Sequence, residues 1–218
     1  MVVYVVTGAS RGLGYEFVCQ LSRNADNIVF GLARNKEATE KKVATDGLKN
    51  VHIVSADIND HKSLQAAKAD IEKQTSVVDV LINNAAYMNP KTQFVGLTDF
   101  EKDPDVLYDD LMVNFQTNVI GVVKVTNTFL PMIRKSNVRK VITISTGLAD
   151  DTFTNGYNIF EAAPYSISKA ALNTVVAKYN AQHGKSSDGI LFLAISPGLV
   201  DTGSDGVRKL LSILSLEP

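Results

Sequence analysis

The chain has 218 residues, of which 45% are hydrophobic and 21% are charged. This is the size and composition of an ordinary globular protein, and we expect residues 1–218 to form a single domain. The net charge of −1 gives no bulk attraction to nucleic acid or to an acidic membrane surface. Cys19 is the only cysteine, so no internal disulfide can form, which favours a reducing, cytoplasmic location. The three histidines lie far from metal-ligand spacing to Cys19, and no apolar run is long enough to span a bilayer, so neither a metal site nor a membrane segment is expected.

The first predicted strand, residues 2–6, is a β-branched run without polar alternation, as in a central parallel strand. It leads into Thr7-Gly-Ala-Ser-Arg-Gly-Leu-Gly14, after which a helical pattern begins. Strand, glycine turn and helix together favour phosphate binding, because glycines let the backbone approach a pyrophosphate and the helix N-terminus supplies N–H groups. The spacing is G-x-x-x-G-x-G, so an ordinary glycine-rich turn is the alternative. The candidate pyrophosphate-binding residues are Gly8, Ser10, Arg11, Gly12, Leu13 and Gly14.

The second predicted strand, residues 27–33, ends at Arg34 and Asn35 without an acidic residue. An acid at this position would accept a ribose hydroxyl of NAD, whereas an arginine favours the 2′-phosphate of NADP. Arg11 can supply a second guanidinium to the same phosphate. Either arginine alone is compatible with a solvated surface charge, but the pair favours NADP(H) over NAD(H).

The rest of the chain alternates between strand and helix patterns. Further strands are predicted at residues 51–55, 77–82, 141–144 and 190–195, and helices at 36–46, 62–74, 106–134 and around Tyr165. Pro131 is expected to bend the long helix near its end. Residues 87–104 and 150–163 are predicted to be loops. Six strands alternating with helices indicate one doubly wound parallel sheet of the α/β class, with ligands at the carboxyl ends of the strands.

Polar residues follow the third and fourth predicted strands. Asp57 either accepts from the adenine amino group or caps the next helix, although Asp60 is better placed for the cap. Asn83 and Asn84 either bond neighbouring loops or line the cofactor cleft.

Tyr165 and Lys169 are four residues apart in a predicted helix and therefore lie on one face. A fixed ammonium near a phenol favours the phenolate, so Lys169 should lower the pKa of Tyr165 from its usual value of about 10. Such a phenol can give a proton to a carbonyl oxygen or take one from an alcohol. The spacing alone is common on surface helices, so this interpretation depends on the motifs around it.

Four motifs occur in a fixed order along the chain. They are Thr7-Gly-x-x-x-Gly-x-Gly14, Asn83-Asn84-Ala85, Tyr165-x-x-x-Lys169 and Pro197-Gly198-x-Val200-x-Thr202. Together they resemble the classical short-chain dehydrogenase/reductase family, in particular its carbonyl reductases and ketoreductases, over residues 2 to about 203. The resemblance implies a Rossmann-like three-layer αβα fold and a nicotinamide dinucleotide cofactor.

The resemblance also implies roles for individual residues. Tyr165 would be the general acid or base, and Lys169 would lower its pKa and hold the nicotinamide ribose. Asn118 would hold a water in a proton relay to the lysine, with Asn114 as the alternative. A hydroxyl after the fifth strand, at Ser145 or Thr146, would bind the substrate oxygen. The implied cofactor contacts are Asp57 and Ile58 at the adenine, Asn84 and Ala85 near the ribose, and Pro197, Gly198, Val200 and Thr202 at the nicotinamide end.

The chain departs from the family pattern in three places. The usual Ser-Ser pair is Ser145-Thr146 here, and either hydroxyl is a candidate. Ala86 stands where glycine is usual. Few residues follow Thr202, so we expect the seventh strand to be absent, with an exposed sheet edge, a missing pocket wall and an impaired common subunit interface as the consequence.

The leading hypothesis is an NADP(H)-dependent oxidoreductase that reduces a ketone or aldehyde to an alcohol, or catalyses the reverse. Aromatic and apolar residues in the two predicted loops favour an apolar or aromatic substrate, or else pack on the protein body. They are Tyr87, Met88, Phe94, Phe100, Phe153, Tyr157 and Phe160. The alternatives are a non-catalytic dinucleotide-binding regulatory protein and a related reaction such as dehydration or epimerisation. By family analogy a homodimer, through the long helix and the Tyr165 helix, or a homotetramer is expected.

Overall fold

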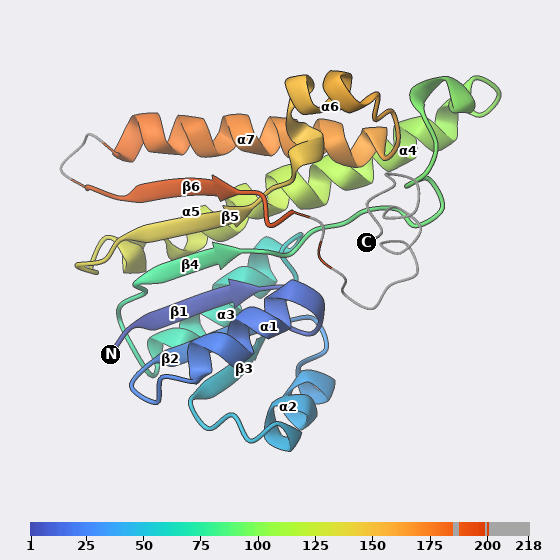
Figure 1. The fold of residues 1–218 in the computed structure, drawn as a ribbon. Coiled ribbons are helices and arrows are strands. Elements are labelled where there is room, and N and C mark those ends of the chain that lie inside the picture. The colour runs from blue at the N-terminus through green and yellow to red at the C-terminus, as the bar shows by residue number, and fades with distance from the viewer. Residues whose placement is uncertain (185–187, 199, 201–218) are drawn as a thin grey trace.

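A computed structural model describes residues 1–184, 188–198 and 200. Its centre is a parallel sheet of six strands in the order β3-β2-β1-β4-β5-β6 (Figure 1). The strands are β1 (Val3–Thr7), β2 (Ile28–Ala33), β3 (Val51–Ser55), β4 (Val80–Asn83), β5 (Lys140–Ile144) and β6 (Leu191–Ile195). The strand order reverses between β1 and β4, and a crevice at such a reversal is where open α/β sheets bind ligands. The predicted doubly wound Rossmann-like fold is confirmed.

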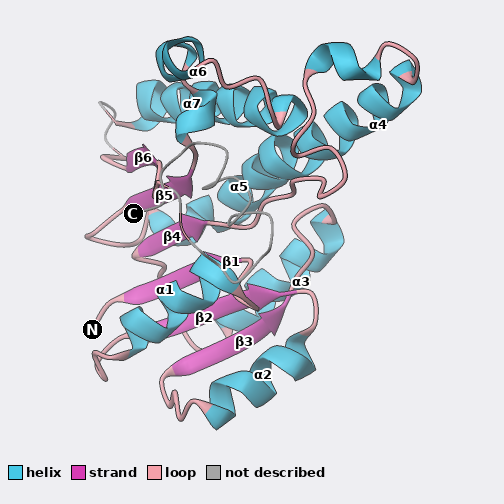
Figure 2. Ribbon diagram, turned by 45° about the vertical axis from the view of Figure 1, so that its right-hand side comes forward, coloured by secondary structure: helices cyan, strands magenta, loops and turns pink. Residues whose placement is uncertain are grey.

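Helices connect the strands on both faces of the sheet. They are α1 (Gly12–Ser22), α2 (Lys36–Thr45), α3 (His61–Glu72), α4 (Pro104–Phe115), α5 (Val122–Ile133), α6 (Asp151–Tyr157) and α7 (Ala163–His183), with short turns at η1 (Leu97–Phe100) and η3 (Gly147–Ala149). One buried cluster joins α3, α5 and α7 to one face of the sheet, and a second joins α1 and α2 to the other. Figure 2 shows α1 on one side of the sheet, and α3 and α5 on the opposite side.

The long helix predicted over residues 106–134 is a continuous run of α4, a π-helical turn η2 (Gln116–Gly121) and α5. Pro131 lies inside α5, which ends at Ile133. A π-helical turn inserts an extra residue into the helical repeat and often occurs at functional sites. Here it contains Asn118, one of the candidate site residues.

The prediction of a loop over residues 150–163 is wrong in its first half, which forms α6 beside α7 (Figures 1 and 2). The Asp150 side chain accepts from the Phe153 N–H and starts this helix, and Asn158 ends it with a φ of 53°. Local capping therefore makes a short helix where the sequence lacks the apolar periodicity that predicts one. Strand β4 also begins at Val80, later than the predicted residue 77.

Strand β6 forms one edge of the described sheet. Phe192 is buried against the α7 side, whereas Leu191, Leu193 and Ile195 on the opposite face are 41%, 38% and 42% exposed. The prediction that a seventh strand is absent concerns residues that lie outside the described part of the chain. No helix among the described residues is both long and apolar enough to cross a membrane.

Candidate functional site

The glycine turn connects the end of β1 to the start of α1 at the centre of the sheet. Gly8 has a φ of 68° and Gly12 a φ of 55°, both in the left-handed region that favours glycine. A Cβ on Gly14 would lie 2.2 Å from the Gly8 carbonyl oxygen, so only glycine allows the helix to start this close to the turn. The sequence expectation of a tight turn that brings the backbone near the helix N-terminus is therefore confirmed.

Helix α1 differs from the next two helices at its N-terminus. Its N-cap residue, Arg11, makes no side-chain cap, and no acidic residue lies in the first turn. In α2 and α3 the Asn35 and Asp60 side chains accept from backbone N–H groups. The N–H groups and positive dipole end of α1 are thus left for an external anion, which fits a dinucleotide pyrophosphate.

Arg11 and Arg34 are both exposed, and neither forms an ion pair with a described residue. Arg34 directly follows β2, and the Ala9 N–H of the glycine turn donates to the Leu32 carbonyl near the end of that strand. Both arginines therefore lie at neighbouring strand ends, with no acidic partner that would neutralise them. This arrangement fits an anionic group at that edge.

Thr7 is a site residue that the sequence reasoning missed. Its hydroxyl is buried and accepts from the Asn84 N–H at 2.9 Å and the Ala85 N–H at 3.0 Å. The Asn84 side-chain amide donates to the Thr7 carbonyl at 3.0 Å and the Gly8 carbonyl at 3.4 Å. Of the two roles considered for the amides after β4, the structure shows that Asn84 bonds a neighbouring loop. The feature of the sequence that could have identified Thr7 is a hydroxyl at the last position of a buried strand.

Asp57 and Ile58 lie after β3. The Asp57 carboxylate accepts from the Asn59 N–H at 2.9 Å, while Asp60 caps α3 as the spacing predicted. Ile58 is buried and points at Gly121, where an added Cβ would lie 3.0 Å from the Ile58 Cδ1. The side chain of Ile58 therefore packs against η2.

Tyr165 and Lys169 lie in the first turns of α7, next to the end of β5. Lys169 is 2% exposed, and its Nζ donates to the Ile144 carbonyl at 2.8 Å. This Nζ is 5.7 Å from the centroid of the Tyr165 ring. Burial lowers the pKa of Lys169 to about 8. The predicted tyrosine–lysine pair is therefore present on one helix face, with the lysine bonded to the strand end that carries Ser145 and Thr146.

The expected direction of the Tyr165 pKa is wrong for this structure. Burial raises the pKa of Tyr165 to about 12, because removing the phenol from water disfavours its charged form. Lys169 does not compensate, since its ammonium is directed at the Ile144 carbonyl and its own charge is disfavoured by burial. The Tyr165 phenol therefore keeps its proton at neutral pH.

The two hydroxyls after β5 are used differently. Ser145 is buried, and its Oγ donates to the Asn173 Oδ1 at 2.6 Å. The Thr146 Oγ1 accepts from the Leu148 N–H at 3.2 Å, so its own hydrogen is not used in that bond. Thr146 is thus the hydroxyl with a donor left for another group. Asn173, four residues after Lys169 on α7, was not identified from the sequence.

Asn118 is fully buried, and its side chain binds the segment that follows β4. Its Oδ1 accepts from the Tyr87 N–H at 2.7 Å, and its Nδ2 donates to the Tyr87 carbonyl at 2.8 Å and the Ser168 Oγ at 2.9 Å. The structure brings Asn118 next to the Tyr165 helix, but through Ser168 and not through Lys169. Ser168 was missed, although a polar residue three positions after Tyr165 lies on nearly the same helix face.

The last predicted motif follows β6. Pro197 and Gly198 are exposed, Gly198 with a φ of 76°, and Val200 is partly buried. Thr202 lies outside the described residues. Within the described part of the chain, no group of three or more histidine, cysteine or acidic residues could hold a metal ion.

Comparisons with known proteins agree with this geometry. A family model described as short chain dehydrogenase matches residues 2–209. The short chain dehydrogenase virK of Hypocrea virens is 45% identical over 203 residues, which are 92% of this chain and 74% of that protein. The short-chain dehydrogenase/reductase AacuF of Aspergillus aculeatus is 48% identical over 198 residues, which are 90% and 73% of the two chains.

Among solved structures, the NADPH-bound carbonyl reductase from chicken fatty liver is similar, with a TM-score of 0.79 and 26% identity over 92% of this chain and 77% of that one. Three features of the structure agree with these similarities. They are the glycine turn, the tyrosine–lysine pair on α7 and the strand order. The chain belongs to the short-chain dehydrogenase/reductase family of oxidoreductases.

Proposed function

We propose that this protein is an NADP(H)-dependent carbonyl reductase that converts a ketone or aldehyde to an alcohol, or runs the reverse reaction. The observation that carries the proposal is the buried Lys169 ammonium, which lies 5.7 Å from the centroid of the Tyr165 ring and donates to the Ile144 carbonyl, two residues before Thr146. Tyr165 gives a proton to the carbonyl oxygen in reduction, and the Thr146 hydroxyl donates to the same oxygen as negative charge develops on it. The nicotinamide, when bound, supplies or accepts the hydride.

Several residues of this chain would hold the cofactor. The open N-terminus of α1, with Gly8, Gly12 and Gly14, would bind the pyrophosphate. Lys169 has three donor protons and uses one on Ile144, so it has donors left for ribose hydroxyls. Asp57 and Ile58 would meet the adenine, Ala85 the ribose, and Pro197, Gly198, Val200 and Thr202 the nicotinamide end.

The preference for NADP rests on Arg11 and Arg34, which are exposed and have no acidic partner among the described residues. A 2′-phosphate between two guanidinium groups gains charge-assisted hydrogen bonds that a ribose hydroxyl does not. Replacing Arg34 with Asp should lower the NADPH/NADH ratio of kcat/KM by at least about tenfold. Arg23→Asp, at an exposed arginine after α1, is the matched control and should leave the ratio unchanged. An unchanged ratio in Arg34→Asp would remove this residue from the phosphate site.

The proposed substrate is apolar or aromatic. Phe153, Tyr157 and Phe160 are 40%, 69% and 64% exposed on and after α6. The Phe160 ring lies against Gly96, where an added Cβ would be 3.0 Å from Cδ2, which brings this segment next to the chain that follows β4. Exposed aromatic rings near the carboxyl ends of the strands supply an apolar surface for a substrate.

A panel of aliphatic, aromatic and polar ketones and aldehydes, assayed with NADPH and NADH by nicotinamide absorbance, tests the activity. We expect turnover with NADPH and a preference for aromatic carbonyls. The alternative function is that of a non-catalytic dinucleotide-binding protein. NADPH binding in a fluorescence titration, without turnover of any carbonyl in the panel, would support that alternative over catalysis.

The proposed assembly is a homodimer through α4 and α7. Tyr108, Met112, Phe115 and Ile167 expose apolar surface on these helices. The last three of these residues also line a cavity of about 150 Å³. A two-fold axis would place this same patch on itself, as isologous interfaces require. Sedimentation should give a dimer for the native chain and a monomer for Met112→Glu. A native monomer at micromolar concentration would contradict this assembly.

A further inference from the structure

Helix α4 and the π-helical turn η2 carry a row of buried polar side chains that the proposed chemistry does not use directly. Asp110, Asn114 and Asn118 are four residues apart and therefore share one helix face. They are 4%, 1% and 0% exposed. The Asn114 Nδ2 donates to the Asp110 Oδ1 at 2.8 Å. The Asn118 Nδ2, whose two hydrogens are shared among three acceptors, lies 3.2 Å from the Asn114 Oδ1. The three side chains thus form one continuous hydrogen-bonded row, which we call the α4 ladder.

The α4 ladder holds both ends of the segment that follows β4. At one end the Asn118 amide bonds the N–H and the carbonyl of Tyr87. At the other end the Thr92 hydroxyl, which is also buried, donates to the Asp110 Oδ2. Residues 87–92 are therefore attached to one helix face by side chains at both ends.

The same ladder reaches the Tyr165 helix. The Asn118 Nδ2 donates to the Ser168 Oγ at 2.9 Å, and the Ser168 Oγ donates to the Tyr165 carbonyl at 2.6 Å. One buried amide therefore connects the segment after β4 to the backbone of Tyr165. Because the segment follows β4 at the carboxyl edge of the sheet, this connection joins that edge to the helix that carries Tyr165.

Burying the Asp110 carboxylate at this position is unfavourable for the free energy of folding. The carboxylate is buried, and among the described residues only the Thr92 hydroxyl and the Asn114 amide bond it. A buried carboxylate without a basic partner costs free energy, and strong hydrogen bonds recover only part of that cost. A satisfied buried network does, however, fix one arrangement of the groups that it joins.

We propose that Asp110 and Asn114, with Thr92, are positioning residues that fix residues 87–92 against the Tyr165 helix and so set the wall of the carbonyl site. The effect on catalysis rests on the carbonyl reductase activity proposed above. The ladder acts through Asn118 and the backbone of Tyr165, and its members exchange no proton with the substrate.

The test compares Thr92→Val, which removes only the hydroxyl at nearly constant size, with Thr92→Ser, which keeps it. Asp110→Asn leaves one ladder donor without an oxygen acceptor, and Asp109→Asn makes the same charge change at the neighbouring exposed position. We expect Thr92→Val and Asp110→Asn to raise the KM for the carbonyl about tenfold, with kcat within about threefold and the NADPH Kd within about twofold. Thr92→Ser and Asp109→Asn should keep the native KM.

A loss of thermal stability alone would not raise KM while leaving kcat nearly unchanged. It would also not explain a native KM in Thr92→Ser. Native KM values in both Thr92→Val and Asp110→Asn, or an equal change in Asp109→Asn, would overturn the proposal. If the native protein turned over no carbonyl, the proposed activity would be contradicted. The role of the α4 ladder would then be tested by hydrogen exchange. Faster exchange of the peptide spanning residues 87–92 in Thr92→Val than in Thr92→Ser supports the ladder, and equal exchange overturns it.

Discussion

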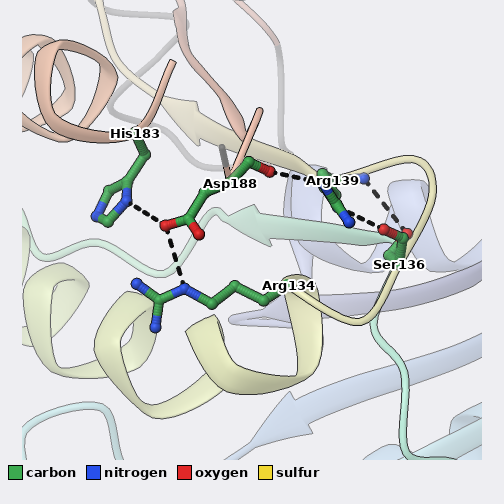
Figure 3. Close-up of polar contacts among 5 residues, drawn as sticks. All are labelled: Arg134, Ser136, Arg139, His183 and Asp188. Atoms are coloured by element: carbon green, nitrogen blue, oxygen red, sulfur yellow. Dashed lines mark hydrogen bonds and ion pairs between the residues drawn. The ribbon is translucent and has the colours of Figure 1, made fainter. Parts of the chain in front are cut away.

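The amino and carboxyl ends of the sheet are both rich in polar side chains, but these side chains have different partners. At the amino end the groups bind one another, as Figure 3 shows. The Asp188 Oδ2 lies 2.9 Å from the His183 Nδ1 and 3.2 Å from the Arg134 Nε. Hydrogen bonding by His183 holds the pKa of Asp188 below its usual range. The Arg139 side chain donates to the Asp188 and Ser136 carbonyls, so loops before β5 and β6 are joined.

At the carboxyl end some polar groups also bond one another, such as Ser145 and Asn173, but others have hydrogen-bonding capacity that no described residue uses. The Tyr165 hydroxyl makes no hydrogen bond with a described residue, and Lys169 uses one of its three donor protons. The α1 N-terminus has no side-chain cap. The comparison indicates that polar side chains at the amino end stabilise the fold, and we propose that those without partners among the described residues at the carboxyl end bind ligands. Changes at the two ends should therefore separate stability from activity.

The largest expected effect is at the carboxyl end, in Tyr165→Phe. Removing the only proposed proton donor should lower kcat about a thousandfold. The NADPH Kd should stay within about threefold, because the ring and Lys169 remain. Steady-state kinetics and a fluorescence titration measure the two quantities. A variant within tenfold of the native kcat would exclude Tyr165 as the acid.

The next effect distinguishes the two hydroxyls after β5. Thr146→Val should lower kcat about a hundredfold, because it removes a donor to the developing oxyanion. Ser145→Ala should lower kcat less than about tenfold, because the Ser145 hydroxyl donates to Asn173. Thr146→Ser should keep most of the rate as the control. The opposite order of the two losses would assign the role to Ser145.

A change at the amino end should affect stability alone. The Asp79 carboxylate accepts from the Val3 N–H at 2.7 Å and the Ser136 hydroxyl at 2.5 Å. Asp79→Asn leaves one of these buried donors without a partner and should lower the free energy of unfolding by about 2 kcal/mol, with kcat/KM unchanged. Urea unfolding measures it, and Asp70→Asn, at an exposed ion pair on α3, serves as the matched control. A loss of kcat/KM in Asp79→Asn would contradict the expectation that changes at the amino end affect stability alone.

The last effect is a pH dependence at the carboxyl end, which amounts to about 1.4 kcal/mol for each pH unit. Burial lowers the pKa of Lys169 from 10.5 to about 8 in the folded protein. Between these values the unfolded chain binds a proton that the folded protein does not, so raising the pH favours folding. The free energy of unfolding of the native protein, relative to Lys169→Met, should rise by about 1.4 kcal/mol per pH unit above pH 8. Parallel curves for the two proteins from pH 7 to pH 10 would contradict the lowered pKa. The exposed Lys41→Met is the control and should show no such difference.

The strands and the glycine turn were predictable because local sequence determines them. A β-branched run such as residues 2–6 fits a buried parallel strand, and Gly8 and Gly12 take backbone angles that other residues avoid. The Tyr165 and Lys169 positions follow from helical periodicity alone. Helix α6 was missed because caps at Asp150 and Asn158 define it, and not an apolar repeat.

The fold class, the order of the motifs and the pairing of Tyr165 with Lys169 could be predicted from the sequence, because these depend on periodicity and spacing within short stretches. The partners of the individual side chains could not be predicted in this way. Thr7 joins β1 to the residues after β4, Ser145 is bonded to Asn173, and burial raises the pKa of Tyr165. Burial and hydrogen bonding depend on neighbours from distant parts of the chain, such as Thr7 and Asn84, which are 77 positions apart.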